Sequence, residues 1–180
     1  MKLKNLITFL YTMICGLVLV LVFTKINTSP AKSVIETENE RKTNMPYSLQ
    51  LYEAIEKFTK KYSIPKEVAY NVAYRETGYR GPFDWRYNPH QKSFAGAVGP
   101  MQIITRYAHH YAGRKVTEQE LKTNIPLNVE VSMRMLRELH NRYGSWSVAC
   151  GYYNTGYPIV NDYGAYCASI KNYQSKWNKI

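Results

Sequence analysis

The apolar residues of this 180-residue chain follow two patterns, one continuous and one periodic. Residues 6–23 form the continuous one, an 18-residue stretch without a charged side chain. A helix of about 17–25 apolar residues crosses a bilayer core, so this stretch predicts a transmembrane anchor within residues 1–24. Lys2 and Lys4 precede it, which predicts a cytoplasmic N-terminus and an exported remainder. A cleaved signal segment with a small-residue site at residues 29–31 is the alternative.

The periodic pattern begins after a polar segment. Residues 25–45 are mixed in charge and have little apolar content, which predicts a flexible linker that cannot bury a core. In residues 46–180 apolar positions recur three and four residues apart, the period of amphipathic helices. These residues show no sustained alternation of apolar and polar positions that would predict a strand. We therefore expect a single, mainly helical domain that follows the anchor and linker.

Caps and helix breakers divide this domain. A first helix is expected up to Tyr62, and Ser63 is expected to cap a second helix that has Pro65 in its first turn and stops at Gly78. Glycine, proline and asparagine then predict a loop over residues 78–94. Further helices are expected over about 100–111, after a capping box at Thr117 and Glu120, and over 126–143, 145–154 and 163–177.

Three short motifs interrupt the helical pattern. The first, Arg75-Glu76-Thr77-Gly78, ends an apolar helix. The second, residues 96–103, reads Gly-Ala-Val-Gly-Pro-Met-Gln-Ile, and its glycines allow close approach of the backbone to a ligand. The third, residues 151–156, reads Gly-Tyr-Tyr-Asn-Thr-Gly. A carboxyl among apolar side chains keeps its proton to higher pH, which makes Glu76 a candidate general acid; a solvated or salt-bridged surface group beside Arg75 is the alternative at this point.

In this order the motifs resemble the soluble lytic transglycosylase family of the lysozyme-like superfamily. The family pattern is Glu-Ser, then Gly-Ala-x-Gly-Leu-Met-Gln, then Ala-Tyr-Asn-x-Gly, and the resemblance covers roughly residues 52–173. It implies a lysozyme-like α+β fold that is mainly helical, and cleavage of the glycan strands of peptidoglycan. The chain departs from the pattern at Thr77, at Pro100, at Gly151-Tyr152, and in a longer segment between the first two motifs.

The resemblance also implies roles for individual residues. Glu76 is expected to be the catalytic acid and then the base. The glycine-rich motif is expected to line the glycan cleft, with a helix opening at Met101 and Gln102. Tyr153 is expected to contact the sugar near the scissile bond, and Asn154 to support the cleft. The substrate-binding residues are therefore predicted to be Gly99, Met101, Gln102, Tyr153, Asn154 and Tyr166.

Two alternatives to a lytic transglycosylase stay open at this stage. A hydrolytic muramidase, as in goose-type lysozymes, would use Asp84 as a second carboxylate beside Glu76. A non-catalytic wall-binding or assembly protein is the other alternative. The sequence also leaves open whether such a domain serves wall remodelling, a secretion or conjugation apparatus, or phage entry.

Charge and side-chain chemistry narrow the partners. The net charge of +11 favours polyanions, but no nucleic-acid-binding motif accompanies it, so the expected partners are peptidoglycan strands and, through the anchor, a membrane. The histidines show no spacing typical of metal ligands, and no metal or cofactor is expected. Cys150 and Cys167 lie in the exported part, where a disulfide and two buried thiols are both open.

Overall fold

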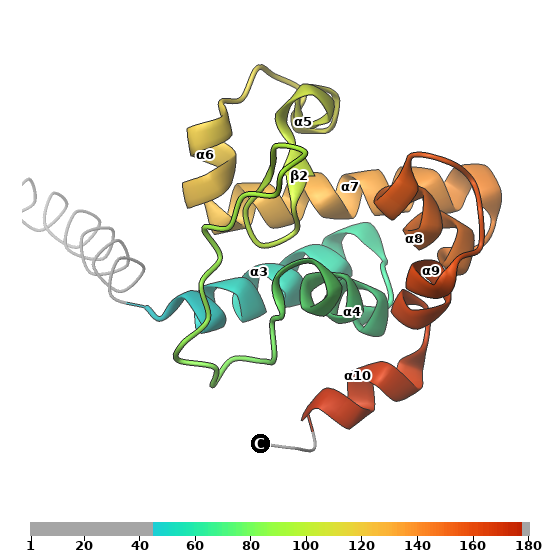
Figure 1. The fold of residues 1–180 in the computed structure, drawn as a ribbon, viewed down its shortest axis with the longest axis horizontal. Helices are drawn as coiled ribbons and strands as arrows, with labels where there is room; N and C mark the ends of the chain where they lie inside the picture. Colours follow the sequence, from blue (N-terminus) through green and yellow to red (C-terminus); the bar gives the residue numbers. More distant parts are fainter. Residues whose placement is uncertain (1–44, 178–180) are drawn as a thin grey trace, which may run out of the picture. The chain divides into compact units, whose positions relative to one another are not determined.

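The longest described helix, α7 (Ile125–Tyr143), is the centre of the fold. The computed structural model describes residues 45–177, and the predicted anchor and all but the last residue of the linker lie outside the described residues. Figure 1 shows α7 crossing the domain, with α6 near its N-terminal end and α8 near its C-terminal end. Helices α3, α5 and α8 pack against it. Within residues 45–177 no helix is long and apolar enough to span a membrane.

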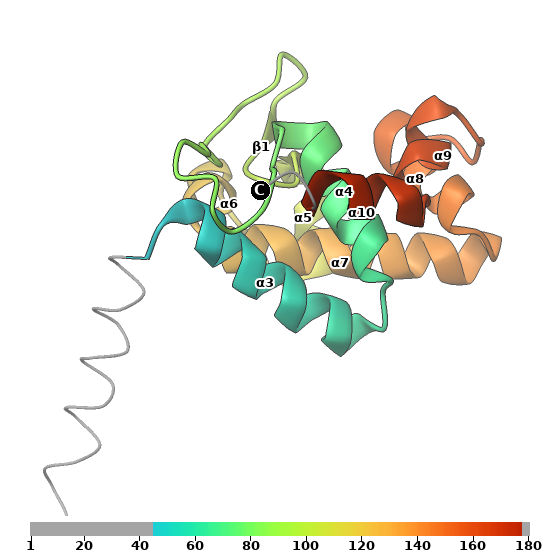
Figure 2. The same ribbon diagram turned by 90° about the horizontal axis from the view of Figure 1, so that it is seen from below.

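The remaining elements surround α7 in chain order. They are α3 (Tyr47–Tyr62), α4 (Lys66–Thr77), β1 (Ala97–Val98), β2 (Ile103–Ile104), α5 (Thr105–Ala112), α6 (Glu118–Thr123), α8 (Trp146–Thr155), α9 (Asp162–Cys167) and α10 (Ile170–Trp177). The prediction of a mainly helical domain is confirmed. Figure 2 shows α10 beside α4, to which it packs, and α8 beside α9.

Helix α4 carries the first motif and is buried on most of its surface. Val68, Ala69, Val72 and Ala73 are at most 1% exposed, and they join side chains of α3 and α7 in the core. The predicted stop at Gly78 is confirmed, since Gly78 closes the helix in the left-handed conformation (φ 73°). The end of α4 therefore lies in an apolar setting at a fixed position.

The prediction that Ser63 is the N-cap of α4 was wrong. Ser63 closes α3 in the left-handed conformation (φ 52°) instead of opening α4. Pro65 is the N-cap of α4 and has no side-chain cap bond. The short connection lets the Ser63 amide satisfy the carbonyl of Lys60 at the end of α3, and proline fixes the entry into the next helix.

The second motif forms a short hairpin, which corrects the expectation of a helix starting after Pro100. Strands β1 and β2 pair antiparallel, Ala97 with Ile104 and Val98 with Ile103. Helix α5 starts only at Thr105. Gly99 (φ 80°) and Gln102 (φ 50°) are both left-handed, and a helix cannot pass through such residues. Strands of two residues are too short to show alternation in the sequence.

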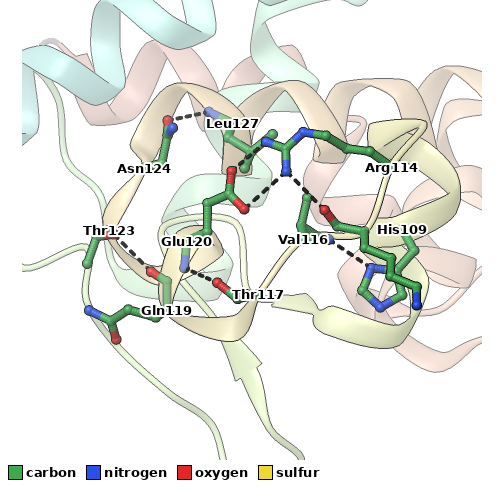
Figure 3. Close-up of polar contacts among 10 residues, drawn as sticks. His109, Arg114, Val116, Thr117, Gln119, Glu120, Thr123, Asn124 and Leu127 are labelled. Carbon is green, nitrogen blue, oxygen red and sulfur yellow. Dashed lines mark hydrogen bonds and ion pairs between the residues drawn. The ribbon is translucent and has the colours of Figure 1, made fainter.

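The connection from α5 to α7 is held by local polar contacts (Figure 3). Thr117 caps α6 by accepting a hydrogen bond from the Glu120 amide at 3.0 Å, as the capping pattern predicted. The Glu120 carboxylate binds the guanidinium of Arg114, with one contact at 3.1 Å. Asn124 then caps α7 through the Leu127 amide.

The predicted helix over residues 163–177 is divided into α9 and α10. The Asn71 side chain of α4 donates to the carbonyls of Cys167 (3.0 Å) and Ser169 (2.9 Å). These carbonyls therefore have hydrogen-bond partners without the backbone amides of a continuous helix. Helices α8 and α9 touch closely, because a Cβ on Gly164 would lie 2.2 Å from the Ser147 carbonyl oxygen. Cys150 and Cys167 face this contact as free, buried thiols, so of the two alternatives the structure shows thiols.

Candidate active site

Glu76 lies in the last turn of α4, where α9 approaches it. Its carboxyl is half-buried and accepts a short hydrogen bond at Oε1 from the hydroxyl of Tyr163, a buried residue of α9. The neighbouring Arg75 turns away over aromatic rings, with its guanidinium 5.4 Å from the Tyr163 ring and 5.2 Å from the Tyr166 ring. The acid is therefore held by a phenol and has a cation nearby, without a direct ion pair among the described contacts.

Burial controls the protonation of this carboxyl. Desolvation raises the pKa of Glu76 above its ordinary value, because an apolar setting penalises the charged form. The hydrogen bond from Tyr163 and the positive charge of Arg75 both lower it, and burial outweighs them. Burial, and then the charge of Glu76, raise the pKa of Tyr163, which therefore stays a hydrogen-bond donor. The pair has the properties of a general acid with a fixed orientation.

Thr77 ties the end of α4 to the hairpin. Its hydroxyl accepts from the Tyr87 hydroxyl at 2.7 Å and donates to the Pro100 carbonyl at 2.9 Å, all in a buried setting. The Gln91 side chain adds a second tie by donating to the Thr77 carbonyl at 3.1 Å. The threonine that departs from the family pattern therefore keeps the hydroxyl that the site uses.

The glycine-rich turn is held from below by Asn128 of α7, a residue that the sequence analysis missed. Its fully buried side chain donates to the Val98 carbonyl (2.9 Å) and accepts from the Met101 amide (3.0 Å). A Cβ on Gly99 would lie 2.3 Å from the Asn128 side-chain nitrogen, so only glycine fits there. A polar residue within an apolar helix stripe is the sequence signal that could have pointed to Asn128.

The three predicted substrate-binding residues of this turn have different surroundings from one another. The Met101 side chain is fully buried and belongs to the core, while its carbonyl accepts a hydrogen bond from the Tyr153 hydroxyl at 2.6 Å. Gln102 lines a cleft and donates to the Gly99 carbonyl at 2.9 Å, which fixes its side chain at the rim. Gly99 shapes the turn through its contact with Asn128.

Tyr153 connects the turn to the acid. Besides its bond to Met101, its hydroxyl accepts from Ser132 at 3.0 Å. Burial, and then the negative charge of Glu76, raise the pKa of Tyr153, so the two side chains lie within electrostatic reach of one another. Asn154 is exposed beside it and accepts a hydrogen bond from Asn161 at 3.4 Å. Tyr153 of the third motif thus bonds to the second motif and lies within electrostatic reach of the first.

A cleft of about 340 Å³ opens beside these residues. Helices α5, α7 and α8 and strand β2 supply its walls, and four tyrosines line it together with apolar side chains. Aromatic faces pack on the faces of sugar rings, and nearby amides and hydroxyls bond sugar hydroxyl groups. Its polar and aromatic lining residues include Gln102, Arg106, Tyr107, Tyr111, Tyr152, Tyr153 and Asn154.

The contacts described for Tyr166 and Asp84 are not with Glu76. Tyr166 stacks on Tyr74 at 6.0 Å under the Arg75 guanidinium, and it is Tyr163, one turn earlier in α9, that contacts Glu76. Sequence spacing could not choose between two tyrosines three residues apart on one helix face. The charge of Asp84 acts on Tyr79 and Tyr87, whose pKa values are raised mainly by burial.

Within residues 45–177, no group of three or more histidine, cysteine or acidic side chains could hold a metal ion. The arrangement offers one half-buried acid, a phenol that orients it and a nearby cleft lined by tyrosines. The acid does not itself line this cleft, but its charge acts on Tyr153, which does, so the arrangement could transfer a proton to a sugar bound beside Tyr153.

Comparison with known proteins agrees with this geometry. The family model for the transglycosylase SLT domain matches residues 53–175, which include all three motifs. No curated protein and no solved structure matches the chain. The resemblance drawn from the motifs is confirmed. The chain belongs to the transglycosylase SLT family, whose domains act on the glycan strands of peptidoglycan.

Proposed function

We propose that this chain is a lytic transglycosylase that cleaves the β-1,4 bond between N-acetylmuramic acid and N-acetylglucosamine. The observation that carries the proposal is Glu76, a carboxyl whose pKa is raised by burial, oriented by Tyr163 and within electrostatic reach of cleft residue Tyr153. Family membership supports the substrate class.

The reaction needs one carboxyl used twice. Glu76 first gives its proton to the glycosidic oxygen, the bond from C1 of muramic acid to that oxygen breaks, and the shortened strand leaves as an alcohol. The Glu76 carboxylate then takes the proton of the C6 hydroxyl on the same muramic acid. The C6 oxygen bonds to C1 and forms a 1,6-anhydro ring, so no water is consumed and the acid is restored.

The surroundings of Glu76 suit both steps. Burial keeps the carboxyl protonated to higher pH, which favours the first step. The Tyr163 hydrogen bond and the charge of Arg75 stabilise the carboxylate formed after that step. These opposing influences suit a group that must both give and take a proton near neutral pH.

Support for a second carboxylate is weaker. A hydrolytic muramidase would need Asp84 near the scissile bond, to position water or stabilise the sugar cation. The contacts that the structure describes connect the charge of Asp84 to Tyr79 and Tyr87, and those of Glu76 to Tyr163 and Arg75. We therefore retain the single-carboxyl mechanism.

We also propose that the domain works on the wall side of a membrane, held there by the apolar stretch at residues 6–23. A protease added outside intact spheroplasts should then degrade the domain while the N-terminal stretch stays with the membrane. Protection of the whole chain would contradict this location.

The product distinguishes the mechanisms. Purified full-length protein in detergent should release peptidoglycan fragments that end in 1,6-anhydro-muramic acid, measured by mass spectrometry. Fragments heavier by one water would show hydrolysis and overturn the transglycosylase proposal. The Glu76→Gln variant, treated identically, provides the background level of fragments.

A further inference from the structure

Among the residues that line the cleft, Arg106 alone carries a full charge. It lies in the first turn of α5, and its side chain is exposed. The guanidinium donates to the Tyr107 hydroxyl at 2.8 Å and lies 4.7 Å from the centre of the Tyr107 ring. The aromatic ring therefore supports the cation at the rim of the cleft without neutralising it.

Three other arginines of the domain have carboxylate partners. Arg114 binds Glu120 (Figure 3), Arg134 lies 3.1 Å from Glu130, and Arg142 lies 2.9 Å from Glu138. Within the described part of the chain, Arg106 has no carboxylate within ion-pair distance. Its charge is thus available to a ligand.

The position of Arg106 in its helix does not favour a positively charged side chain. The first turn of a helix carries partial positive charge, which disfavours a basic side chain and favours an anion. No acidic residue stands in the first turn of α5 to offset Arg106. The start of α5 therefore adds its own positive potential to that of the guanidinium, and both face a cleft that is otherwise uncharged.

We infer that Arg106 binds a carboxylate carried by muramic acid units of the glycan strand, and that it makes the cleft prefer acidic over neutral glycan. This rests on the proposed function, because it names the chemistry recognised at the same cleft. The carboxylate has two possible sources. One is the lactyl group of a muramic acid without peptide, and the other is a stem peptide attached to that group, whose amide bond removes the lactyl charge.

Binding to three glycans tests the inference. The full-length Glu76→Gln protein, which we expect to turn substrate over much more slowly, is compared with the same protein carrying Arg106→Gln. The probes are peptide-free glycan strands, peptide-bearing strands, and oligomers of N-acetylglucosamine without any carboxylate. We expect Arg106→Gln to weaken binding of at least one acidic probe about tenfold, as for loss of a charged hydrogen bond, and to leave the neutral oligomer unchanged.

The three glycan probes distinguish the two sources of the carboxylate, and two further variants serve as controls. Loss confined to peptide-free strands identifies the lactyl carboxylate, and loss confined to peptide-bearing strands identifies the stem peptide. Arg86→Gln removes one exposed charge outside the cleft and should change none of the three affinities. Arg106→Lys keeps the charge and should retain part of the preference, which guards against misfolding of the glutamine variant.

Unchanged binding of both acidic probes, or an equal loss on all three glycans, would overturn the role of Arg106. The proposed function fails separately, if the protein with Glu76 intact releases no anhydro-ended fragments from peptidoglycan. A protein that cleaves peptidoglycan but ignores Arg106→Gln would therefore reject this inference and leave the transglycosylase proposal standing.

Discussion

The end of α4 and the start of α5 treat their charged side chains in opposite ways. Glu76 is half-buried, bonded to Tyr163, and has a raised pKa. Arg106 is exposed at the rim of the cleft and has no carboxylate partner among the described residues. The difference teaches that proton transfer requires an oriented group in a surrounding that destabilises its charged form. Recognition of an anion instead requires a cation that is not already paired with a carboxylate.

One turn connects the two regions. Thr77 holds the Pro100 carbonyl, Asn128 holds Val98 and Met101, and β2 leads directly into α5. Changes at the acid should alter chemistry, changes at the rim should alter preference, and changes at the turn should damage both.

The largest expected effect comes from the acid. Glu76→Gln should lower the rate of glycan cleavage by about 10²–10⁴-fold, because the glutamine amide cannot donate the proton. The release of anhydro-ended fragments measures this rate. Glu67→Gln, at the other end of the same helix, is the matched control and should retain activity. Normal activity of the Glu76 variant would remove it from the mechanism.

The turn comes next. Gly99→Ala should lower the free energy of unfolding by about 2–5 kcal/mol, because the new Cβ meets Asn128 in a left-handed conformation. Gly96 is also left-handed but has open space around its Cβ position, so Gly96→Ala should cost only about 1–2 kcal/mol. Denaturant unfolding of both variants measures the cost of the contact that a Cβ at Gly99 makes with Asn128 and the Leu121 carbonyl oxygen. Equal losses would show that the contact carries no energy.

The bond from Thr77 to the turn should show a smaller effect. Thr77→Val removes a buried hydroxyl from Pro100 and Tyr87 at nearly constant shape, and should cost about 1–3 kcal/mol. Thr77→Ser keeps the hydroxyl and should retain most activity, whereas the valine variant should lose activity as well as stability. A valine variant as active and stable as the serine variant would contradict the role of the hydroxyl.

Tyr163 should act on the pH profile. Tyr163→Phe removes a bond that lowers the pKa of Glu76, so the pKa should rise further. Activity that needs the protonated acid is lost as pH rises through that pKa, so the alkaline limb of the profile should move to higher pH. Tyr166→Phe, which removes the hydroxyl one turn away, should leave the limb in place. Identical profiles of the two variants would assign no role to the Tyr163 bond.

The smallest effect concerns stability. The folded pKa of Glu76 lies above its ordinary value of 4.5, so the folded state binds more protons between these two values. Stability contributed by this group is therefore complete at low pH and falls as pH rises through that window. Glu76→Gln removes the fall, so the variant should melt at a higher temperature than the wild type at pH 7, and this gain should vanish below about pH 4. A gain that is independent of pH would have another cause.

Local patterns predicted much of the helical fold and part of the site. Gly78, Thr117 and the stripe of α7 marked helices correctly, since caps and periodicity act over a few residues. Glu76 and Tyr153 were identified through motif order and do lie within electrostatic reach. The prediction that Ser63 caps α4 was wrong because a serine between two helices can either open the second or, in the left-handed conformation, close the first. The residue type alone does not distinguish the two.

The sequence by itself determined most of the helices, that the domain belongs to the transglycosylase family, and which carboxyl stands out as the acid. Only the tertiary structure decided that Tyr163 and not Tyr166 binds Glu76, that Asn128 supports the turn, and that Arg106 lines the cleft without a carboxylate partner among the described residues. The reason is physical. Caps and periodicity depend on neighbours in the chain, whereas hydrogen-bond partners and burial depend on which helices meet, and that is set by packing of the whole core.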